Sequence, residues 1–500
     1  MILRPQFKDF KIIGFYIGKI IGGLAIFMAI PLAVAFVIGE TNPLFDFITS
    51  FLFCVVLALA LNIFCYTEAD LKWSHGMIVV SLSWLVISVI AAVPLFLSGH
   101  FNSPLDALFE AMSGFTTTGL SLANDLAHMS YAHNLWRHLT QHMGGLGVVV
   151  IVLTFFVGGS SGAFRLYVGE ARDERVLPNI QKTARFIFGA SLVFLILGTA
   201  ALALSAFAGG MPLHKAIFHG ACIFMAAFNT GGFSPQYQSI MYYHNFSFEI
   251  ISIVIMILGA MNFHLHYVVW TGQFNELRKD FEIAAFFLSV MVLGGLTVLG
   301  LTKFGVYDSA MALYRKGFYQ LISAHTSTGF QTIYSTQFIQ EWGSLALFGI
   351  IFAMSLGGCA NSTAGGIKVM RLGIVAKAFI NDVKHYVSPE SAVFVQKIHH
   401  IKDTILTEKQ MRIACMVVIA FLFTFFVGGV VGMMCGYPFV DSFFESTSAT
   451  GNVGLSCGIT SPSMPDALKI TYIIQMWAGR LEFISVFAFI GFILALVKGR

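Results

Sequence analysis

The sequence contains few charged residues. Asp, Glu, Lys and Arg make up 11% of its 500 residues, whereas about 25% is usual in soluble domains. Hydrophobic residues reach 57%, more than the core of a soluble domain takes up. No segment interleaves basic and aromatic residues as a nucleic-acid surface does, so we expect no nucleic-acid partner. These features exclude an ordinary soluble protein and predict an integral membrane protein.

Cysteine pairs and cofactor motifs are also lacking. The seven cysteines are scattered and no CxxC occurs, which is typical of small apolar packing residues rather than of disulfides or metal ligands. Neither a GxGxxG motif nor a Walker loop occurs. We therefore expect no organic cofactor in this chain and no enzyme activity.

Hydrophobic residues instead form long runs. A helix needs about 20 apolar residues to cross a bilayer, and ten runs meet this length. The first run is too long for a signal peptide and lacks a small-residue cleavage site, so it should stay in the mature protein. The eighth run is interrupted. The ten predicted spans lie near residues 12–38, 44–66, 76–98, 138–158, 184–208, 247–271, 281–301, 343–380, 411–435 and 468–496.

The distribution of Lys and Arg predicts the orientation in the membrane. Basic residues are retained on the cytoplasmic side. With the N-terminus inside, 22 of the 29 Lys and Arg lie inside, six lie outside, and Arg480 lies within a span. We therefore expect a multi-pass protein, surrounded by membrane lipid, with both termini in the cytoplasm.

Four shorter apolar stretches each precede a run of Thr, Ser, Asn and Gly. These stretches are too short to cross the membrane, so each is typical of a half-helix that enters and turns back. The first and fourth share seven identities in a 16-residue window, which indicates duplication. Aligned on one glycine, the four read SGFTTTGLS (113–121), AAFNTGGFS (226–234), SAHTSTGFQ (323–331) and SATGNVGLS (448–456).

The four polar runs predict an ion filter. Non-helical backbone at membrane depth must line water or be covered by protein, and four copies can surround one axis. Rings of carbonyl oxygens replace the hydration shell of K⁺, and glycine permits the positive φ angles this needs. The predicted K⁺-binding residues are Thr116, Thr117, Thr118, Gly119, Asn229, Thr230, Gly231, Gly232, Thr326, Ser327, Thr328, Gly329, Gly451, Asn452, Val453 and Gly454.

The short helices fit the same interpretation. Ser103 and Pro104 are typical of a cap and first helical position, and Pro438 opens the fourth helix in a similar way. Asp106 and Asp441 lie in first turns, where a negative charge is favourable. Glu110 and Glu445 either attract cations or hold the filter loops by hydrogen bonds, and we favour the structural role.

Together these residues resemble the Trk/Ktr/HKT superfamily of potassium uptake proteins, most closely its bacterial TrkH/TrkG branch. The resemblance covers nearly the whole chain, and the two spans before the first repeat fit the same branch. One departure is the glycine pair in the second loop, NTGGF, which should leave that backbone looser. The motifs that carry the resemblance are TTTG in the first repeat, MNFHLH (261–266), GGCANSTAGGIKV (357–369), GNVGL in the fourth repeat and AGRLEF (478–483).

The resemblance implies potassium uptake across the bacterial inner membrane. It also implies a homodimer with one pore per protomer and a cytoplasmic ring of nucleotide-binding RCK subunits of the TrkA type, on which nucleotide sensing would reside. Passive flux and coupling to H⁺ or Na⁺ both remain open. The implied fold is all-α, with four tandem repeats of span, pore helix, filter loop and span. The expected segments are a two-helix extension at 1–70 and repeats at 71–160, 161–275, 276–400 and 401–500.

The interrupted eighth span predicts a gate. Each glycine costs about 1 kcal/mol in a helix relative to alanine, so residues 357–366 should form an irregular loop beneath the filter, while a small-residue helix crossing is the alternative. Lys368 and Arg371 should join the basic cytoplasmic segment. The predicted gating residues are Gly357, Gly358, Asn361, Ser362, Thr363, Gly365, Gly366 and Arg480.

Arg480 and a pair of histidines allow other interpretations. A charge within an apolar span is usually functional, and the resemblance places Arg480 just below the filter. A structural salt bridge with Glu482 or a pore-helix carboxylate is the alternative. His138 and His142 lie four residues apart, as haem ligands on a helix do, which keeps a membrane oxidoreductase as a second function class. We favour histidines at the membrane interface.

Overall fold

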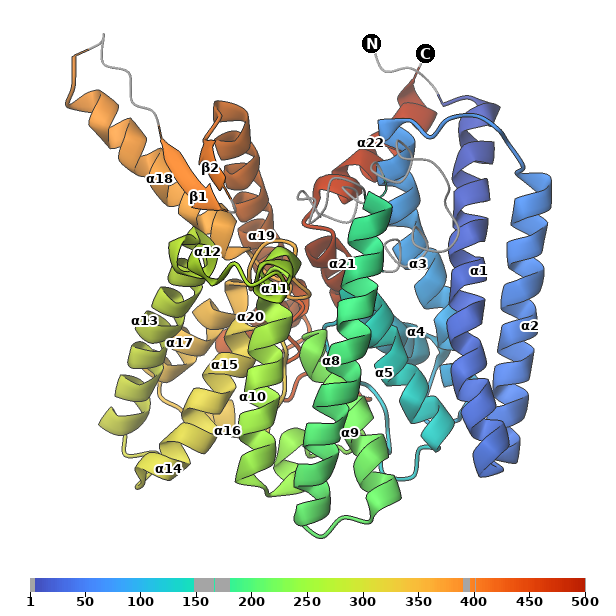
Figure 1. Cartoon of the computed structure of the whole chain (residues 1–500), viewed down its shortest axis with the longest axis horizontal. Helices are drawn as coiled ribbons and strands as arrows, with labels where there is room; N and C mark the ends of the chain where they lie inside the picture. Colours follow the sequence, from blue (N-terminus) through green and yellow to red (C-terminus); the bar gives the residue numbers. More distant parts are fainter. Residues whose placement is uncertain (1–4, 148–165, 167–179, 390–395, 401, 500) are drawn as a thin grey trace.

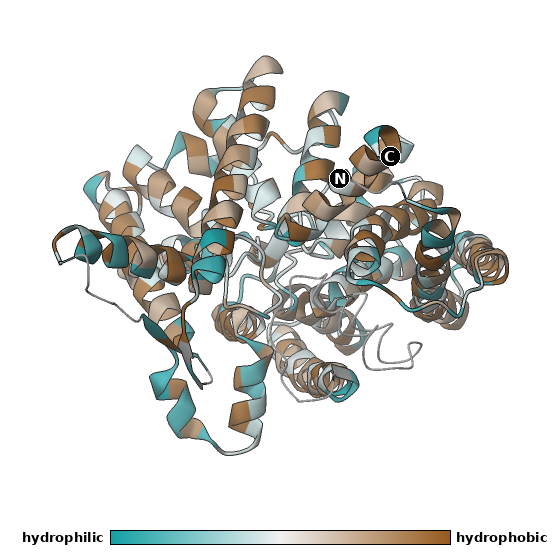
Figure 2. Cartoon of the chain, turned by 90° about the horizontal axis from the view of Figure 1, so that it is seen from above, coloured by the Kyte–Doolittle hydropathy of each residue, from teal (hydrophilic) through white to brown (hydrophobic). Residues whose placement is uncertain are grey.

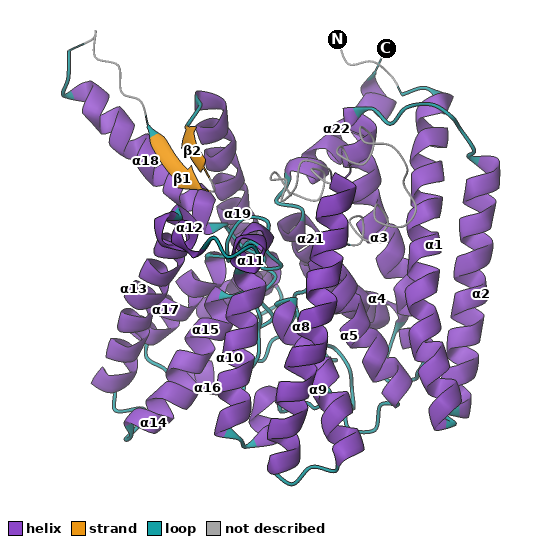
Figure 3. Ribbon diagram, viewed as in Figure 1, coloured by secondary structure: helices purple, strands orange, loops and turns teal. Residues whose placement is uncertain are grey.

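The computed structural model describes residues 5–147, 166, 180–389, 396–400 and 402–499. Helices form most of the described chain, and its two strands belong to one hairpin (Figure 3). The predicted all-α class is therefore confirmed apart from this hairpin. The second half of the fourth predicted span (148–158) and the predicted boundary between the first two repeats lie outside the described residues.

Two antiparallel helices precede the repeats. They are α1 (Phe7–Ile38) and α2 (Thr41–Phe64), joined by a tight turn at Gly39. Large hydrophobic side chains at helical spacing on α2 remain more than half exposed, including Leu52, Val56 and Leu59. Such a stripe is typical of a lipid-facing surface. Hydrophobic residues predominate on the peripheral helices generally (Figure 2).

Each of the four repeats consists of a long helix, a short helix that ends in a loop, and a third helix. In the third repeat the short helix includes a π-helical segment, which the sequence pattern did not predict. The long helices are α3 (Trp73–Leu97), α8 (Ile180–Ala208), α13 (Phe281–Lys303) and α19 (Glu408–Met434). The short helices are α4 (Pro104–Phe115), α9 (Leu213–Phe228), the run α14 (Ala310–Ala312), η2 (Leu313–Phe318) and α15 (Tyr319–His325), and α20 (Phe439–Thr450). The third helices are α5 (Tyr131–Leu146), α10 (Phe246–Ala260), α17 (Ser344–Ser355) and α21 (Asp466–Arg480).

The third helix is broken in repeats two, three and four. It continues as α11 (Phe263–Trp270), α18 (Val369–Tyr386) and α22 (Ile484–Lys498), respectively. The bend between α10 and α11 is 102°, and that between α21 and α22 is 113°. We predicted only the eighth span as interrupted, so the prediction was wrong for the sixth and tenth. Asn262 caps the start of α11, while Glu482 and Phe483 have positive φ angles that end α21.

Six helices in the described residues are long and apolar enough to span a membrane, and the two bent pairs bring this number to eight. α5 and the interrupted pair α17 and α18 occupy the two remaining predicted spans, 138–158 and 343–380. Shorter segments η1 (Ser239–Tyr243), α12 (Phe274–Lys279) and α16 (Gln337–Gln340) complete the helices of the described residues.

The hairpin lies at the same end of the molecule as both chain termini (Figure 1). Its strands β1 (Lys397–His400) and β2 (Lys402–Ile405) pair antiparallel, with Lys397 opposite Ile405. Burial alternates along β1, so that Ile398 and His400 face inward. By the predicted orientation this end is cytoplasmic, and we call it the inner end and the opposite one the outer end.

Candidate ion site

The four polar loops share one backbone conformation. The first residue of each loop has a negative φ angle and a ψ angle near 0°, as at Thr116 with φ −72°. The second is left-handed although it is not glycine, and the shared glycine is again at positive φ. This alternation turns successive carbonyl groups toward one side, whereas an extended strand would alternate them. The left-handed residues before the glycines are Thr117 (φ 53°), Thr230 (φ 48°), Ser327 (φ 52°) and Asn452 (φ 52°).

Each loop is tied to the helix that precedes it. The amide before the shared glycine donates a hydrogen bond to a carbonyl five residues back. This repeated bond holds a conformation that costs about 1–2 kcal/mol per left-handed residue. The four bonds join Thr118 to Ser113 at 2.9 Å, Gly231 to Ala226 at 2.7 Å, Thr328 to Ser323 at 2.9 Å and Val453 to Ser448 at 2.9 Å.

The four shared glycines close the loops into a ring. Each glycine packs its Cα against the carbonyl oxygen that precedes the glycine of the next loop, so closely that an added methyl group would overlap this oxygen. The fourth loop returns to the first, which makes the sequence of contacts cyclic. The contacts run from Gly119 to Gly231, from Gly232 to Thr328, from Gly329 to Val453, and from Gly454 to Thr118.

The space on the two sides of the ring differs greatly. A cavity of about 340 Å³ opens on the outer side and is lined by all four shared glycines. On the inner side the cavity is about 30 Å³, room for little more than one water molecule. Its lining includes Asn361, Ser362, Lys368 and Arg480. Among the described residues, a path through the ring would therefore open to a wide cavity outside and to a much smaller one inside.

An irregular segment fills the inner side. The chain is not helical between Ser355 and Val369, which confirms the predicted irregular loop and excludes the small-residue helix crossing. Thr363 donates to the carbonyls of Phe228 and Gly259, at 3.0 and 2.8 Å. Its hydroxyl also lies 3.2 Å from that of Thr230. The segment is thus bonded to the end of α9, to α10 and to the second loop.

Small residues in this segment allow close packing. Cβ atoms at Gly357 and Gly365 would overlap the carbonyls of Gly365 and Gly451, respectively. The Gly365 amide donates to Ser327 of the third loop at 2.7 Å. Asn361 and Gly366 have positive φ angles of 52° and 67°. Among the other predicted gating residues, Gly358 packs on Ala260, and Ser362 donates to the carbonyl of Cys359.

Arg480 connects three segments on the inner side. Its guanidinium donates to the Thr117 hydroxyl at 3.1 Å, to the Thr363 carbonyl at 2.6 Å and to the Gly144 carbonyl at 2.7 Å. Glu482, the alternative partner considered above, forms an ion pair with Arg371. Arg480 therefore links the first loop to the irregular segment.

Two basic residues just after the irregular segment are largely buried. Lys368 is buried and donates to the carbonyl of Ala364, and Arg371 is mostly buried against Glu482. We predicted that both join the basic cytoplasmic segment, and their burial was not predicted. The irregular segment folds back on itself, and this fold carries Lys368 to the space under the ring.

Buried ionic contacts support the first loop from the outer side. Glu110 accepts hydrogen bonds from the Ser121 hydroxyl at 2.9 Å and the Leu122 amide at 3.0 Å. It pairs with Arg137 at 2.7 Å, and Arg137 also donates to the carbonyl of Ser234 after the second loop. These contacts agree with the structural role predicted for Glu110.

The fourth repeat holds its loop in a related way. Glu445 accepts bonds from the hydroxyl of Ser456, the counterpart of Ser121, and from the amide of Thr460 at 3.0 Å. The position that corresponds to Arg137, counted from the matched glycines Gly144 and Gly479, is Tyr472. The cation of the first repeat is thus replaced by a phenol in the fourth.

The first of the short helices, α4, is capped as predicted. The Ser103 hydroxyl accepts the amide of Asp106, with proline at the first helical position. The carboxylate of Asp106 also pairs with buried Lys469 of α21 at 2.6 Å, a contact between the first and fourth repeats that was not predicted. Pro438 precedes α20, but it supplies no side-chain cap.

The second loop is supported by side chains of α5. Gln141 donates to the carbonyl of Gly231 and accepts from the amide of Phe233 at 3.2 Å. A Cβ at Gly231 would meet the Gln141 side chain. The second glycine therefore makes room for Gln141, which braces the loop that we expected to be loose. Asn229 donates to His142 at 2.8 Å.

The paired histidines lie inside the bundle. His138 and His142 are both buried, and His138 bonds the carbonyl of Asn134 at 2.7 Å. Their helix α5 packs between α4 and α9, and the location of these histidines at the membrane interface stays a prediction. Arg137 and Gln141 were not predicted as supporting residues. The available signal was the unusual density of polar residues from 133 to 142, at the start of the predicted span 138–158.

Four re-entrant loops closed around one axis within a bundle of apolar helices define a membrane transport protein. The family described as TrkH, cation transport protein, matches residues 44–281 and 281–494. The chain belongs to this family of transporters and is therefore not an enzyme.

Relatives of the family are similar over nearly the whole chain. An uncharacterized cation transporter of Methanocaldococcus jannaschii is 32% identical and covers 97% of this chain and 96% of its own length. The Trk system potassium uptake protein TrkG of Escherichia coli K12 is 29% identical, with 91% and 92% covered. The crystal structure of the potassium transporter TrkH from Vibrio parahaemolyticus superposes with a TM-score of 0.80, at 25% identity, and covers 97% of this chain and 98% of that one.

Proposed function

We propose that this chain carries potassium ions across the membrane through the ring of four loops. The closed ring of glycine contacts is the observation that carries this proposal, because it brings four carbonyl-bearing loops to one axis. The filter comprises residues 116–119, 229–232, 326–329 and 451–454. Relatives named as potassium uptake proteins support K⁺ as the cargo.

Glycine in all four loops favours K⁺ over Na⁺. Without side chains at these positions, backbone carbonyls from each loop can approach the axis and replace the water around K⁺. The alternating backbone keeps these carbonyls on one side. The K⁺ ions in the filter are cargo, and no organic cofactor is needed for this role.

The test is flux through the purified chain in liposomes. We expect K⁺ uptake down a K⁺ gradient, little Na⁺ uptake, and restored growth of a transport-deficient host on limiting potassium. Uptake that requires an opposing or parallel H⁺ or Na⁺ gradient would instead indicate a coupled symporter. Equal permeation of Na⁺ and K⁺ by the folded protein would contradict the proposed filter.

The irregular segment 357–366, together with Arg480, acts as the gate of this path. It fills the inner side, where Thr363 contacts the Thr230 hydroxyl and the Gly365 amide donates to Ser327. Arg480 joins the segment to the first loop, because it donates to both the Thr363 carbonyl and the Thr117 hydroxyl. Opening requires that these bonds break and the segment withdraw. The hydrogen bonds are few and the residues are small. The binding of a partner subunit can therefore supply the free energy that withdrawal of the segment needs.

Thr363→Val tests the gate without changing side-chain size. It removes the hydroxyl bonds to Phe228 and Gly259, so we expect several-fold greater K⁺ flux with unchanged K⁺/Na⁺ preference. Thr302→Val is the matched control, because the Thr302 hydroxyl is exposed and bonds only within its own helix. Equal flux in the parent and Thr363→Val would contradict the gate.

The proposed assembly comprises two copies of this chain and a cytoplasmic partner subunit. We propose a homodimer in the bacterial inner membrane with one pore per protomer. A cytoplasmic RCK-type, TrkA-like subunit binds the inner end near α18 and the hairpin, and it moves the gate in response to nucleotide. Co-purification of such a subunit, and flux measured with and without nucleotide, test this assembly. Flux that never responds to the bound partner would contradict it.

A further inference from the structure

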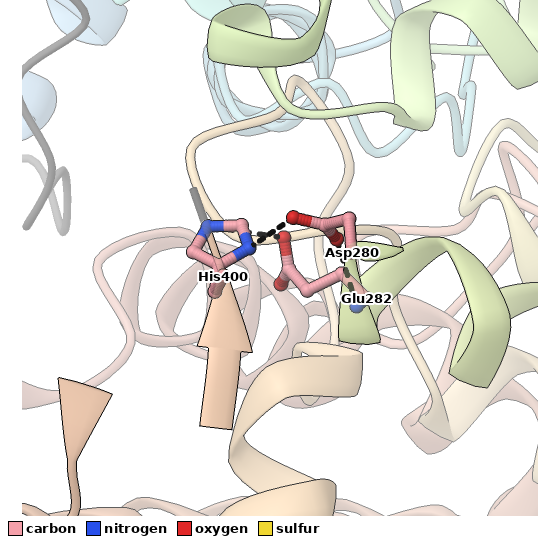
Figure 4. Close-up of side chains that lie close together, drawn as sticks. All are labelled: Asp280, Glu282 and His400. Carbon is pink, nitrogen blue, oxygen red and sulfur yellow. Dashed lines mark hydrogen bonds and ion pairs between the residues drawn. The ribbon is translucent and has the colours of Figure 1, made fainter. Parts of the chain in front are cut away.

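Three side chains that could bind a metal ion meet beneath the hairpin. Asp280 and Glu282 lie at the start of α13, and His400 ends β1 (Figure 4). All three are buried, and one nitrogen or oxygen atom from each lies within 4.8 Å of the others. They come from segments about 120 residues apart in the chain, so the fold assembles them.

The distances suit a small divalent cation. His400 Nδ1 lies 2.8 Å from an Asp280 oxygen, and His400 Nε2 lies 3.7 Å from a Glu282 oxygen. Zinc binds nitrogen and oxygen ligands at about 2.0–2.2 Å, so ligand atoms on one ion lie roughly 3–4 Å apart. One ion binds a single nitrogen of the imidazole, and one donor atom from each residue lies within 4.8 Å of the others. Closing these distances by roughly 1–2 Å would therefore place all three donors on one ion. One imidazole with two carboxylates is a donor set typical of zinc and related metals.

The charges of the neighbourhood point to a bound cation. Two buried carboxylates are costly unless positive charge lies nearby. Lys368 interacts electrostatically with Glu282 and supplies one such charge. A proton on His400 or a bound metal ion would balance the remaining negative charge. The histidine and both carboxylates are ligands that can exchange a proton for a metal.

The cluster is joined to the irregular segment by a second bond of Glu282. Its other carboxylate oxygen accepts the amide of Ala360 at 2.7 Å. Asn262, at the break between α10 and α11, lies 3.3 Å from His400. An ion held by the three side chains would therefore tie the hairpin to the segment beneath the ring.

We propose that Asp280, Glu282 and His400 form a binding site for a divalent transition-metal ion such as Zn²⁺. The ion joins β1 to α13 and, through Glu282 and Ala360, stabilises the irregular segment. The site lies on the inner end and is separate from the ring, so its ion is regulatory and is not the transported cation.

Metal binding to the full-length protein in lipid nanodiscs tests this site. After chelation, Zn²⁺ is added as the probe and binding is followed by calorimetry, with Co²⁺ absorbance as a second readout. We expect one high-affinity ion per chain in the parent. His400→Gln and Glu282→Gln should each weaken binding at least tenfold.

His399→Gln is the matched control. His399 is the neighbouring histidine of β1, but it contacts Asp403 and Glu276 outside the cluster. It should bind Zn²⁺ like the parent. Asp280→Asn keeps the side-chain oxygen that caps α13 by accepting from the amides of Glu282 and Ile283. This variant should also lose affinity for Zn²⁺.

Two results would overturn the proposal. One is equal Zn²⁺ affinity in the parent, His400→Gln and Asp280→Asn, which would place the ion elsewhere. The other is no saturable binding by folded parent protein, which would leave a protonated histidine as the cation. Size-exclusion profiles and thermal unfolding of each variant establish that lost binding is not lost folding.

Discussion

The outer and inner faces of the ring are built differently. On the outer face, a cavity of about 340 Å³ reaches the shared glycines, and the supporting contact of Glu110 and Arg137 is an ion pair that is almost fully buried. On the inner face, the described residues enclose a cavity of about 30 Å³, beside which a small-residue segment and Arg480 are held by hydrogen bonds. The outer face is held by strong contacts, whereas the inner face is closed by contacts that are easier to exchange.

This difference assigns separate tasks to the two faces. Selectivity needs fixed carbonyl positions. The buried Glu110–Arg137 ion pair and the hydrogen bonds that Glu110 and Glu445 accept hold the loops in place. Gating needs two arrangements of similar free energy. Hydrogen bonds between neutral groups, such as those of Thr363 and Gly365, contribute only about 0.5–1.5 kcal/mol each, and those of the charged Arg480 about 1.5–3 kcal/mol each. The inner segment can therefore change arrangement without disturbing the ring.

The largest effect is expected from Gly119→Ser, which breaks the ring itself. Gly119 has φ 89° and its Cα abuts the Gly231 carbonyl, so a side chain adds both backbone strain and overlap. We expect loss of K⁺ over Na⁺ discrimination, measured by growth on limiting potassium and by Na⁺ sensitivity. Gly99→Ser is the matched control, because Gly99 has φ 73° with open space around it. Unchanged selectivity in Gly119→Ser would remove this residue from the filter.

Arg480→Ala should act on the inner face and leave the ring intact. It removes three hydrogen bonds that link the first loop, the irregular segment and the end of α5. We expect several-fold greater K⁺ flux with little change in K⁺/Na⁺ preference. Flux per folded protein and thermal stability are measured together. Normal flux with a large loss of stability would show that Arg480 only holds the structure together.

Glu110→Gln and Glu445→Gln compare two matched positions on the outer face. Removing one partner of a buried ion pair costs about 3–5 kcal/mol, because Arg137 would keep an uncompensated charge. The acceptor bonds of Glu445 come from hydroxyl and amide groups, so its replacement should cost about 1–3 kcal/mol. Unfolding in detergent measures the difference. Equal losses would mean that Arg137 does not depend on Glu110.

The fold and the loops could be predicted because both rest on local patterns. Long apolar runs predicted spans, and repeated glycines predicted the positive φ angles at Gly119, Gly232, Gly329 and Gly454. The interruption at 357–366 followed from four glycines in ten residues. The sharp bends at 261–262 and 481–483 were missed, because a single Asn cap or two left-handed residues leave no periodic signal.

The supporting contacts could not be predicted, because they join distant segments. Arg137 pairs with Glu110 across 27 residues, and Lys469 reaches Asp106 across more than 360. The left-handed residue in each loop, such as Thr117, gave no signal because threonine rarely adopts that conformation. The role of Gln141 became visible only when its side chain was seen in the space beside Gly231.

The smallest effect is expected in the hairpin at the inner end, where His399 contacts Asp403 at 2.7 Å. The hydrogen bond to Asp403 raises the pKa of His399 above its ordinary value of 6.5, and the same bond lowers the pKa of Asp403 below 3.8. The pair therefore stabilises the hairpin between these two ordinary values. This stabilisation is lost as the pH rises through the raised pKa of His399, or falls through the lowered pKa of Asp403. Both groups are open to solvent, so the contribution is small and screened by salt.

NMR titration of histidine-labelled protein, with His399→Gln to assign the signal, should show the His399 pKa falling toward 6.5 in Asp403→Asn. A pKa that stays raised would assign the effect to Glu276, which lies 3.3 Å away on the other side of the His399 imidazole. It would show that this histidine holds the hairpin to α12 and not β1 to β2.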